Sequence, residues 1–229
     1  MLYGQANIET VLRRTKSPFF QAIDSGLDLN YDFRIGGYDL TGRGRHAIFN
    51  GGITVDLNGA LTNGVSGNYI VSPIFTTTAT NKYSVELLFI LLDNQLRGVF
   101  NWGNTPTDNT PWLYLQRNGI NPSTCRWYWG AAYQSSFSVD DKFNLKRPIH
   151  LVFTSTGAGD AKMFYDGKLN TTSSYVPSGV DNLYIYAGVG YHGYQMTKFL
   201  SLKLYNRVLS PGEILVKSME ARRNYGKYY

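Results

Sequence analysis

The sequence predicts an all-β protein whose strands form two stacked antiparallel sheets. Short apolar runs recur from about residue 24 onward and are separated by turns rich in glycine and asparagine. The composition agrees, because 18 tyrosines, 24 glycines and only 17% charged residues are typical of β proteins with many turns. Near the end of the chain, leucines at 200, 202 and 204 alternate with Ser201 and Lys203. That alternation predicts a strand with one face in the core and one face in water.

Residues 1–23 differ from the rest of the chain and are predicted to form a separate arm. Ile8, Val11 and Leu12 follow helical spacing, and Pro18 stops a helix at or before Ser17. We therefore expect an N-terminal arm over 1–23, a β-sandwich domain over 24–210, and a C-terminal helix and tail over 211–229.

The strands can be placed from their apolar patterns and turns. Residues 83–92 are apolar on both faces in their second half, which predicts a buried strand at the centre of a sheet. Asp166 and Gly167 form the residue pair that favours a type I′ hairpin turn. Further strands are predicted over 112–116, 126–133, 149–154, 161–165, 183–187 and 198–204.

A helix is predicted to begin at Pro211. Ser210 can cap its first turn, proline fits the first helical position, and Glu213 completes a capping box with Ser210. The helix is expected to run to about residue 221. Its expected packing face consists of Ile214, Leu215 and Met219.

Two segments near opposite ends of the chain resemble those of a known family. They read YDLTGRGRHAIFNGG over residues 38–52 and FLSLKLYNRVLSPGEIL over residues 199–215, and the stretch from HLVFT to KMFYDGK lies between them. They resemble the opening, closing and central segments of the LamG-like group of concanavalin A-like jelly rolls. The resemblance covers roughly residues 24–215. It implies a two-sheet jelly-roll sandwich that presents a binding surface rather than a reactive centre.

Hydrolysis of glycosidic bonds is the chemistry to test, because the same fold group includes glucanases. Retaining hydrolysis needs two carboxylates about 5 Å apart, and family members that do this carry an E-x-D-x-x-E pattern on one strand. Of the glutamates here, Glu86 alone lies in a predicted strand, and its same-face neighbours Leu88 and Ile90 are apolar. We therefore expect Glu86 to pair with a nearby arginine or lysine, and we expect no enzymatic activity.

Metal sites have little support in the sequence. His46, His150 and His192 lack the spacing of a zinc site, and His150 is expected to be a sheet-face histidine with a satisfied hydrogen bond. No cofactor is expected. Calcium is the alternative that remains open, with Asp140 and Asp141 as candidate ligands, although ordinary turn aspartates are the favoured interpretation.

Aromatic residues beside polar groups are candidates for glycan binding, because an aromatic ring can stack on the apolar face of a sugar. The loop YHGY, between Gly190 and Gln195, is the most favourable candidate, and packing in the core is the alternative for the large aromatics. The predicted glycan-binding residues are Tyr191, His192, Tyr194, Trp102, Asn104 and Trp129.

The net charge of +6 favours anionic partners. Basic residues gather at the two ends, and no nucleic-acid-binding motif accompanies them. The residues predicted to dock on partner proteins are Arg13, Arg14, Lys16, Arg222, Arg223 and Tyr228. No signal peptide is recognisable, and the longest apolar run, residues 87–92, is too short to cross a bilayer. We expect synthesis in a host cytoplasm and no membrane insertion.

The resemblance implies a function in assembly. LamG-like proteins of this kind are frequent among phage and other viral structural proteins. The expected function is that of a non-enzymatic virion surface component (capsid decoration, fibre or tail protein), docked on other virion proteins in a multi-copy assembly and able to contact host glycans. The alternative is a soluble lectin, and a glycoside hydrolase is the least favoured reading.

Overall fold

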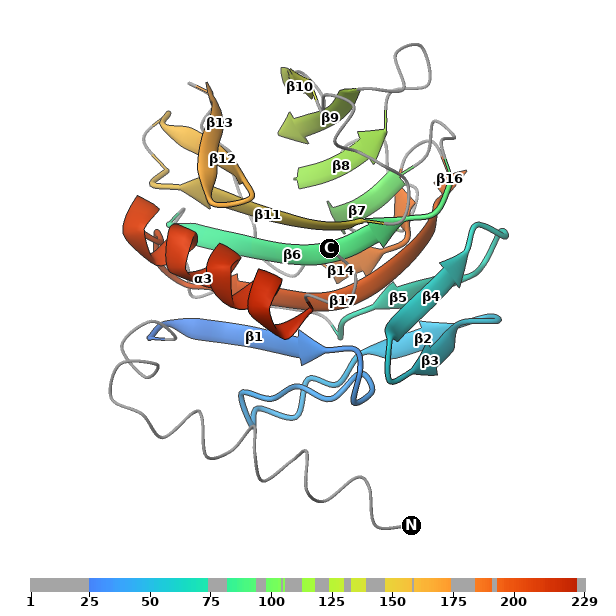
Figure 1. Ribbon diagram of the computed structural model, residues 1–229. Helices are drawn as coiled ribbons and strands as arrows, with labels where there is room; N and C mark the ends of the chain where they lie inside the picture. Colours follow the sequence, from blue (N-terminus) through green and yellow to red (C-terminus); the bar gives the residue numbers. More distant parts are fainter. Residues whose placement is uncertain are drawn as a thin grey trace.

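The computed structural model shows two stacked β-sheets and one C-terminal helix, as the sequence predicts (Figure 1). It describes residues 25–73, 82–93, 98–103, 105, 113–117, 124–129, 133–138, 147–157, 159–173, 184–190 and 193–225. For the strands between residues 113 and 138, the description is limited to backbone pairing.

The first sheet has the strand order β13-β12-β11-β6-β17-β4-β3, and β1 also pairs with β17. Its described strands are β1 Leu27–Asp32, β3 Thr54–Asp56, β4 Gly59–Asn63, β6 Tyr83–Leu91, β11 Pro148–Ser155, β12 Ala161–Tyr165, β13 Lys168–Ser173 and β17 Met196–Tyr205.

The second sheet has the order β10-β9-β8-β7-β14-β5-β2, with the short hairpin β15–β16 attached to β7. Its described strands are β2 Ile48–Asn50, β5 Tyr69–Val71, β7 Gly98–Gly103, β8 Leu113–Arg117, β9 Thr124–Trp129, β10 Tyr133–Ser138, β14 Tyr184–Ala187, β15 Val189–Gly190 and β16 Gly193–Tyr194.

The main core lies between the two sheets. All nine residues of β6 are buried, and β6 pairs with β11 on one side and β17 on the other. The predicted central strand is therefore confirmed. Its odd-numbered residues from Tyr83 to Leu91 join the core between the sheets, whereas Leu88 and Ile90 pack on the opposite face.

The hairpin predicted at Asp166 and Gly167 is confirmed, because β12 and β13 pair across it and both residues have positive φ angles of 49° and 82°. The strand predicted over 126–133 is wrong in extent. Trp129 pairs with Tyr133, so the chain reverses direction between them and forms two strands, β9 and β10.

The alternation predicted for β17 is interrupted by an irregularity in its pairing with β6. The register shifts between Phe199 and Ser201, and such a bulge moves the intervening residue to the other face. Leu202 and Leu204 face the core between the sheets, but Leu200 packs on the outer face. The sequence predicts that this outer face is in water. The structure differs, because the C-terminal helix covers it.

The helix α3 spans Pro211–Asn224 and lies across the outer face of the first sheet (Figure 1). Its predicted capping box is confirmed: Glu213 N–H donates to Ser210 Oγ (3.3 Å), and Ser210 N–H donates to Glu213 Oε2 (2.8 Å). The helix ends three residues later than predicted.

The predicted packing face of α3 is correct only for Ile214, which is fully buried. Leu215 is 49% exposed and Met219 is 62% exposed. The helical period of 3.6 residues places a different set on the face that includes Ile214. The other buried residues are Lys217, Ser218 and Ala221.

The opening segment of the family resemblance forms a loop folded around one buried carboxylate. Asp39 accepts hydrogen bonds from the Thr41 backbone N–H (3.0 Å) and hydroxyl (2.7 Å), and from the Arg45 backbone N–H (3.4 Å). The Tyr31 hydroxyl donates to the Arg45 carbonyl (2.6 Å), and Asp39 N–H donates to His46 Nδ1 (3.0 Å). These residues therefore stabilise the loop that joins β1 to the second sheet.

The closing segment ties the end of β17 to the start of α3. The Arg207 guanidinium contacts the Ser25 carbonyl (2.6 Å) and the Glu213 carboxylate (2.6 and 3.0 Å). Ser84 Oγ donates to the Arg207 carbonyl and accepts from Leu209 N–H, both at 2.9 Å. The segment thus sets the direction in which α3 leaves the sheet.

Candidate functional site

The outer face of the second sheet carries a patch of four tyrosines, which we call the tyrosine patch: Tyr69, Tyr184, Tyr186 and Tyr194. Ring centroids are 6.3 Å apart for Tyr194 and Tyr69, 5.7 Å for Tyr69 and Tyr186, and 5.8 Å for Tyr186 and Tyr184. The rings therefore form a continuous band, with no gap between neighbours larger than an ordinary aromatic contact.

Strand alternation explains why these rings point away from the core. In β14, Ile185 and Ala187 belong to the core between the sheets, so Tyr184 and Tyr186 lie on the opposite face. In β5, Ile70 faces the core and Tyr69 the other side. Tyr186 is buried beneath its neighbours and the other three rings are half-buried. The patch therefore offers aromatic surface on a rigid base.

The register extends this row of residues across the second sheet. Tyr186 pairs with Asn101 of β7, and Asn101 pairs with the position of Tyr114 in β8. Tyr114 in turn pairs with the position of Tyr128 in β9. Asn101 lies on the outer face and its side-chain amide donates to the Thr105 carbonyl (2.9 Å). One cross-strand row thus contains three tyrosine positions and one asparagine.

Of the predicted glycan-binding residues, Tyr194 lies in the tyrosine patch. It pairs with Val189 in the β15–β16 hairpin, whose last described pair is Gly190 with Gly193. Tyr191 and His192, between those glycines, lie outside the described residues. The loop that the sequence singled out is therefore attached directly to the patch.

Trp102 requires a correction. It is 0% exposed, and its ring packs edge-on against Tyr83 with centroids 5.7 Å apart. A ring buried between two sheets cannot stack on a sugar from solvent. Trp102 pairs with Leu113, and Leu113 pairs with Trp129, so the two tryptophans occupy one cross-strand row. The description of Trp129 is limited to this backbone pairing. Asn104 lies outside the described residues.

The predicted docking residues are only partly described. Arg222 and Arg223 lie in the last turn of α3, and the Arg222 guanidinium contacts the Asp166 carboxylate (3.3 Å). The calcium candidates Asp140 and Asp141, together with Arg13, Arg14, Lys16 and Tyr228, lie outside the described residues. In the described part of the chain, no three His, Cys, Asp or Glu residues come together as a metal site would require.

Glu86 lies beneath α3, on the outer face of the first sheet, in a cluster of buried polar groups. Tyr205 Oη donates to Glu86 Oε2 (2.9 Å), and His150 Nε2 lies 3.2 Å from Oε1. The ammonium groups of Lys203 and Lys217 lie 3.5 and 3.9 Å from the carboxylate oxygens. The predicted pairing of Glu86 with a lysine is confirmed. The predicted satisfied histidine is confirmed only in part, because Nε2 of His150 contacts Glu86 whereas its buried Nδ1 has no hydrogen-bond partner among the described residues.

The electrostatics of this cluster favour an ionised carboxylate. Burial opposes ionisation, but Lys203, Lys217 and the contact with His150 together hold the pKa of Glu86 well below its ordinary value. Glu86 is only 3% exposed. Its carboxylate thus fixes α3 to the sheet, and the cluster is closed to a substrate of sugar size.

Sequence reasoning missed three members of the tyrosine patch. Tyr69, Tyr184 and Tyr186 sit in strands, where aromatic residues are common, and nothing nearby marks them as binding residues. The available signal was the spacing of Tyr184 and Tyr186 around a core isoleucine, which places both rings on one face. Two strands far apart in sequence then had to be paired before the patch could be recognised.

Solved structures with this fold include a sialidase and toxin domains. The chain is similar to the Trypanosoma rangeli sialidase in complex with 2,3-difluorosialic acid (TM-score 0.70, 18% identity, covering 88% of this chain and 34% of that one). It is also similar to the receptor-binding domain of botulinum neurotoxin D (TM-score 0.69, 12% identity, 86% and 53% covered). A third is the serotype D ligand-binding domain in complex with N-acetylneuraminic acid (TM-score 0.69, 13% identity, 87% and 52% covered).

These similarities establish the fold as a β-sandwich of the jelly-roll type. The chain spans between about a third and a half of the length of those proteins. No family model matches the chain, and no curated protein matches it in sequence. In the portion of the chain that is described, no helix has the length and apolar character needed to cross a membrane.

Proposed function

We propose that this protein is a carbohydrate-binding module that holds glycans on the tyrosine patch. The observation that carries the proposal is the continuous band of four tyrosine rings on the outer face of the second sheet. A sugar ring has apolar C–H faces that stack on aromatic rings, and tyrosine adds a hydroxyl that can donate and accept hydrogen bonds. Three of the rings are half-buried, so their positions are fixed before a ligand arrives.

Acidic glycans are the class that we expect to bind best. The protein carries a net charge of +6, which favours anionic partners. Two proteins of similar fold hold sialic acid ligands, namely difluorosialic acid and N-acetylneuraminic acid. A sialylated glycan would combine a carboxylate with several C–H faces.

A glycan array that includes sialylated and neutral structures tests the proposal. Tyr69→Ala and Tyr194→Ala remove half-buried rings of the patch and should each weaken array binding about tenfold. Tyr38→Ala is the matched control, because Tyr38 is a more exposed tyrosine (60%) outside the patch. A blank array for the wild-type protein, or equal signals from all variants, contradicts the proposal.

In a more specific version of the proposal, the module is a LamG-like virion surface component that docks on other virion proteins. Its support is the family resemblance of residues 38–52 and 199–215 and the basic residues Arg222 and Arg223 on α3. Removal of residues 1–20, combined with Arg222→Ala and Arg223→Ala, should abolish co-purification with particles. Deletion of all of α3 is unsuitable, because Ile214, Lys217 and Ala221 are buried. Unchanged co-purification of that variant counts against the virion role.

The proposed function includes no catalytic step. Glu86, the glutamate in the central strand, is engaged by Lys203, Lys217 and Tyr205 beneath α3. We propose that the protein presents a surface for binding and leaves the bound glycan unchanged.

A further inference from the structure

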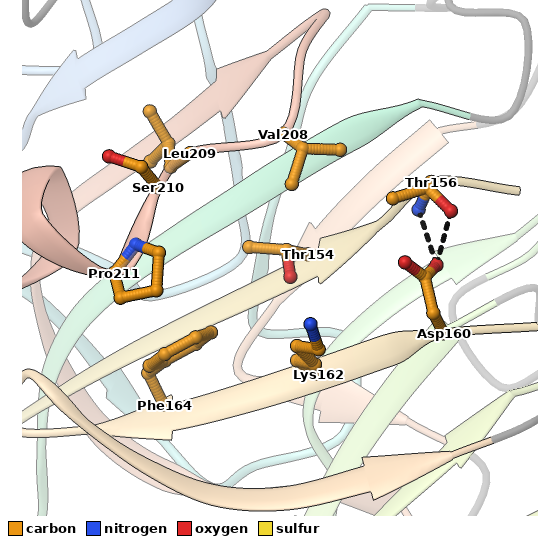
Figure 2. A pocket seen from close by; sticks show the side chains of 9 residues that line it. All are labelled: Thr154, Thr156, Asp160, Lys162, Phe164, Val208, Leu209, Ser210 and Pro211. Atoms are coloured by element: carbon orange, nitrogen blue, oxygen red, sulfur yellow. Dashed lines mark hydrogen bonds between the residues drawn. The ribbon is translucent and has the colours of Figure 1, made fainter.

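A cavity of about 280 Å³ lies on the outer face of the first sheet, beside the start of α3 and on the opposite side of the sandwich from the tyrosine patch (Figure 2). Its size is close to the lower limit of about 300 Å³ for ligand pockets. It is lined by Thr154, Thr156, Asp160, Lys162, Phe164, Val208, Leu209, Ser210 and Pro211.

Two polar groups in this cavity lack partners. Thr154 and Lys162 are directly opposite each other on β11 and β12, and Figure 2 shows the hydroxyl and the ammonium on the inside of the cavity. Among the residues that the structure describes, neither group has a hydrogen-bond or ion-pair partner. Thr154 is only 2% exposed. The Thr154 hydroxyl faces the cavity, so a ligand in the cavity can accept its hydrogen bond.

The local electrostatics favour a single negative charge. Lys162 supplies a cation, and Ser210 and Pro211 place the N-terminus of the 14-residue helix α3, with its partial positive charge, on the same wall. Asp160 lies at the far end, where its carboxylate accepts hydrogen bonds from the backbone N–H (3.1 Å) and hydroxyl of Thr156. The Asp160 carboxylate would repel a doubly charged anion such as phosphate more strongly than a singly charged one.

The remaining wall is apolar. Phe164 lies on one side of the cavity, and Leu209 and Pro211 lie on the other (Figure 2). A ligand that fits must therefore carry a carbon skeleton beside its charged group.

We propose that this cavity binds a small organic carboxylate. One carboxylate oxygen accepts a hydrogen bond from the Thr154 hydroxyl and the other from the Lys162 ammonium. The carbon skeleton lies against Phe164 and Pro211. The two donors match the two oxygens of a carboxylate, and the hydrogen bond to the charged lysine is the stronger of the two.

Benzoate and its neutral analogue benzamide are suitable probes for calorimetric titration of the full chain. Benzoate should bind saturably with a dissociation constant of about 1 mM, as expected for a ligand of this size, and benzamide should bind at least tenfold more weakly. Lys162→Met and Lys162→Gln should each weaken benzoate binding about tenfold, and Thr154→Val about threefold. Asp160→Asn, which removes the repelling charge, should strengthen it.

Lys168→Met is the matched control, because Lys168 is an exposed lysine on β13 outside the cavity. Thermal unfolding verifies that each variant is folded, and amide NMR shifts at residues 154 and 162 locate the bound probe. The proposal is overturned if the folded wild-type chain does not bind benzoate saturably. It is also overturned if benzamide binds equally well, or if both Lys162 variants retain wild-type affinity.

Discussion

At Glu86, one carboxylate from the central strand meets groups from two neighbouring strands and from α3. His150 and Lys203 come from β11 and β17, and Lys217 comes from the helix. The sequence predicted a cationic partner because an isolated charge in a central strand would be too costly to bury. It could not predict Lys217, since that contact depends on where α3 lies on the sheet.

Replacement of Glu86 by glutamine should destabilise the fold strongly. The change keeps the shape but leaves Lys217, which is 2% exposed, beside a neutral group. We expect the free energy of unfolding to fall by about 3 kcal/mol, the cost of removing one partner from a buried ion pair. Urea unfolding at pH 7 measures it. Lys168→Gln, which removes a charge at an exposed residue of β13, should change stability by less than about 0.5 kcal/mol.

The same cluster predicts a dependence of stability on pH. The folded-state pKa of Glu86 lies below its ordinary value of 4.5, because Lys203 and Lys217 favour the charged form. As pH falls below about 4.5, the unfolded chain takes up a proton before the folded chain does, so stability is lost. In the wild-type protein, the stability contributed by the charged Glu86 should begin to fall as the pH drops below about 5, where the unfolded carboxyl starts to titrate, and should continue to fall as the pH is lowered further. A Glu86→Gln variant with the same acid dependence as wild type would contradict this assignment.

Residue type alone did not distinguish core aromatics from surface aromatics. Trp102 and Tyr186 both lie in strands of the second sheet, on β7 and β14, yet Trp102 is in the core and Tyr186 underlies the tyrosine patch. The difference is the face of the sheet that each residue occupies, and that face is known only when the strand register is known. Tyr186 was therefore predicted only as a residue of the strand over 183–187. Trp102, whose strand β7 was not predicted, was incorrectly assigned to the binding surface.

At the scale of elements, the start of α3 is specified by sequence and its packing is not. Ser210, Pro211 and Glu213 are local signals, and each has the predicted role. The packing face depends on the bulge in β17, which moves Leu200 to the outer face beneath Ala221 and Tyr225. Such an irregularity has no dependable signal in one sequence. Strands as short as β2, β3 and β5 were likewise not resolved individually, because three residues cannot establish a period.

Arg207 is predicted to control the acidity of the α3 capping residue. Its hydrogen bond to Glu213 is the principal reason that the pKa of Glu213 is lowered to about 2, and the contacts with Ser210 contribute further. In an Arg207→Gln variant, an NMR titration should find the Glu213 pKa closer to its ordinary value of 4.5. Ser210→Ala should instead cost about 1 kcal/mol of stability through the lost cap. A Glu213 pKa that is unchanged in Arg207→Gln would show that the ion pair is not the cause.

At the scale of the whole molecule, the two outer faces of the sandwich differ in what packs on them. The helix α3 packs on the outer face of the first sheet (Figure 1). A small cavity lies beside the start of the helix. The outer face of the second sheet carries the tyrosine patch, and the β15–β16 hairpin adds Tyr194 to it. The fold class was predictable from alternation and turns, because those follow from local chemistry. The asymmetry between the faces was not, since it requires the complete topology.

The most direct test of the account is the affinity of the strongest array ligand for the wild-type protein, Tyr69→Ala, Tyr194→Ala and Tyr38→Ala, measured by isothermal titration calorimetry. We expect each patch variant to lose about tenfold in affinity, as the removal of one stacked ring would cause, while Tyr38→Ala binds as wild type does. If folded Tyr69→Ala and Tyr194→Ala bind that glycan with wild-type affinity, the tyrosine patch is not the binding surface.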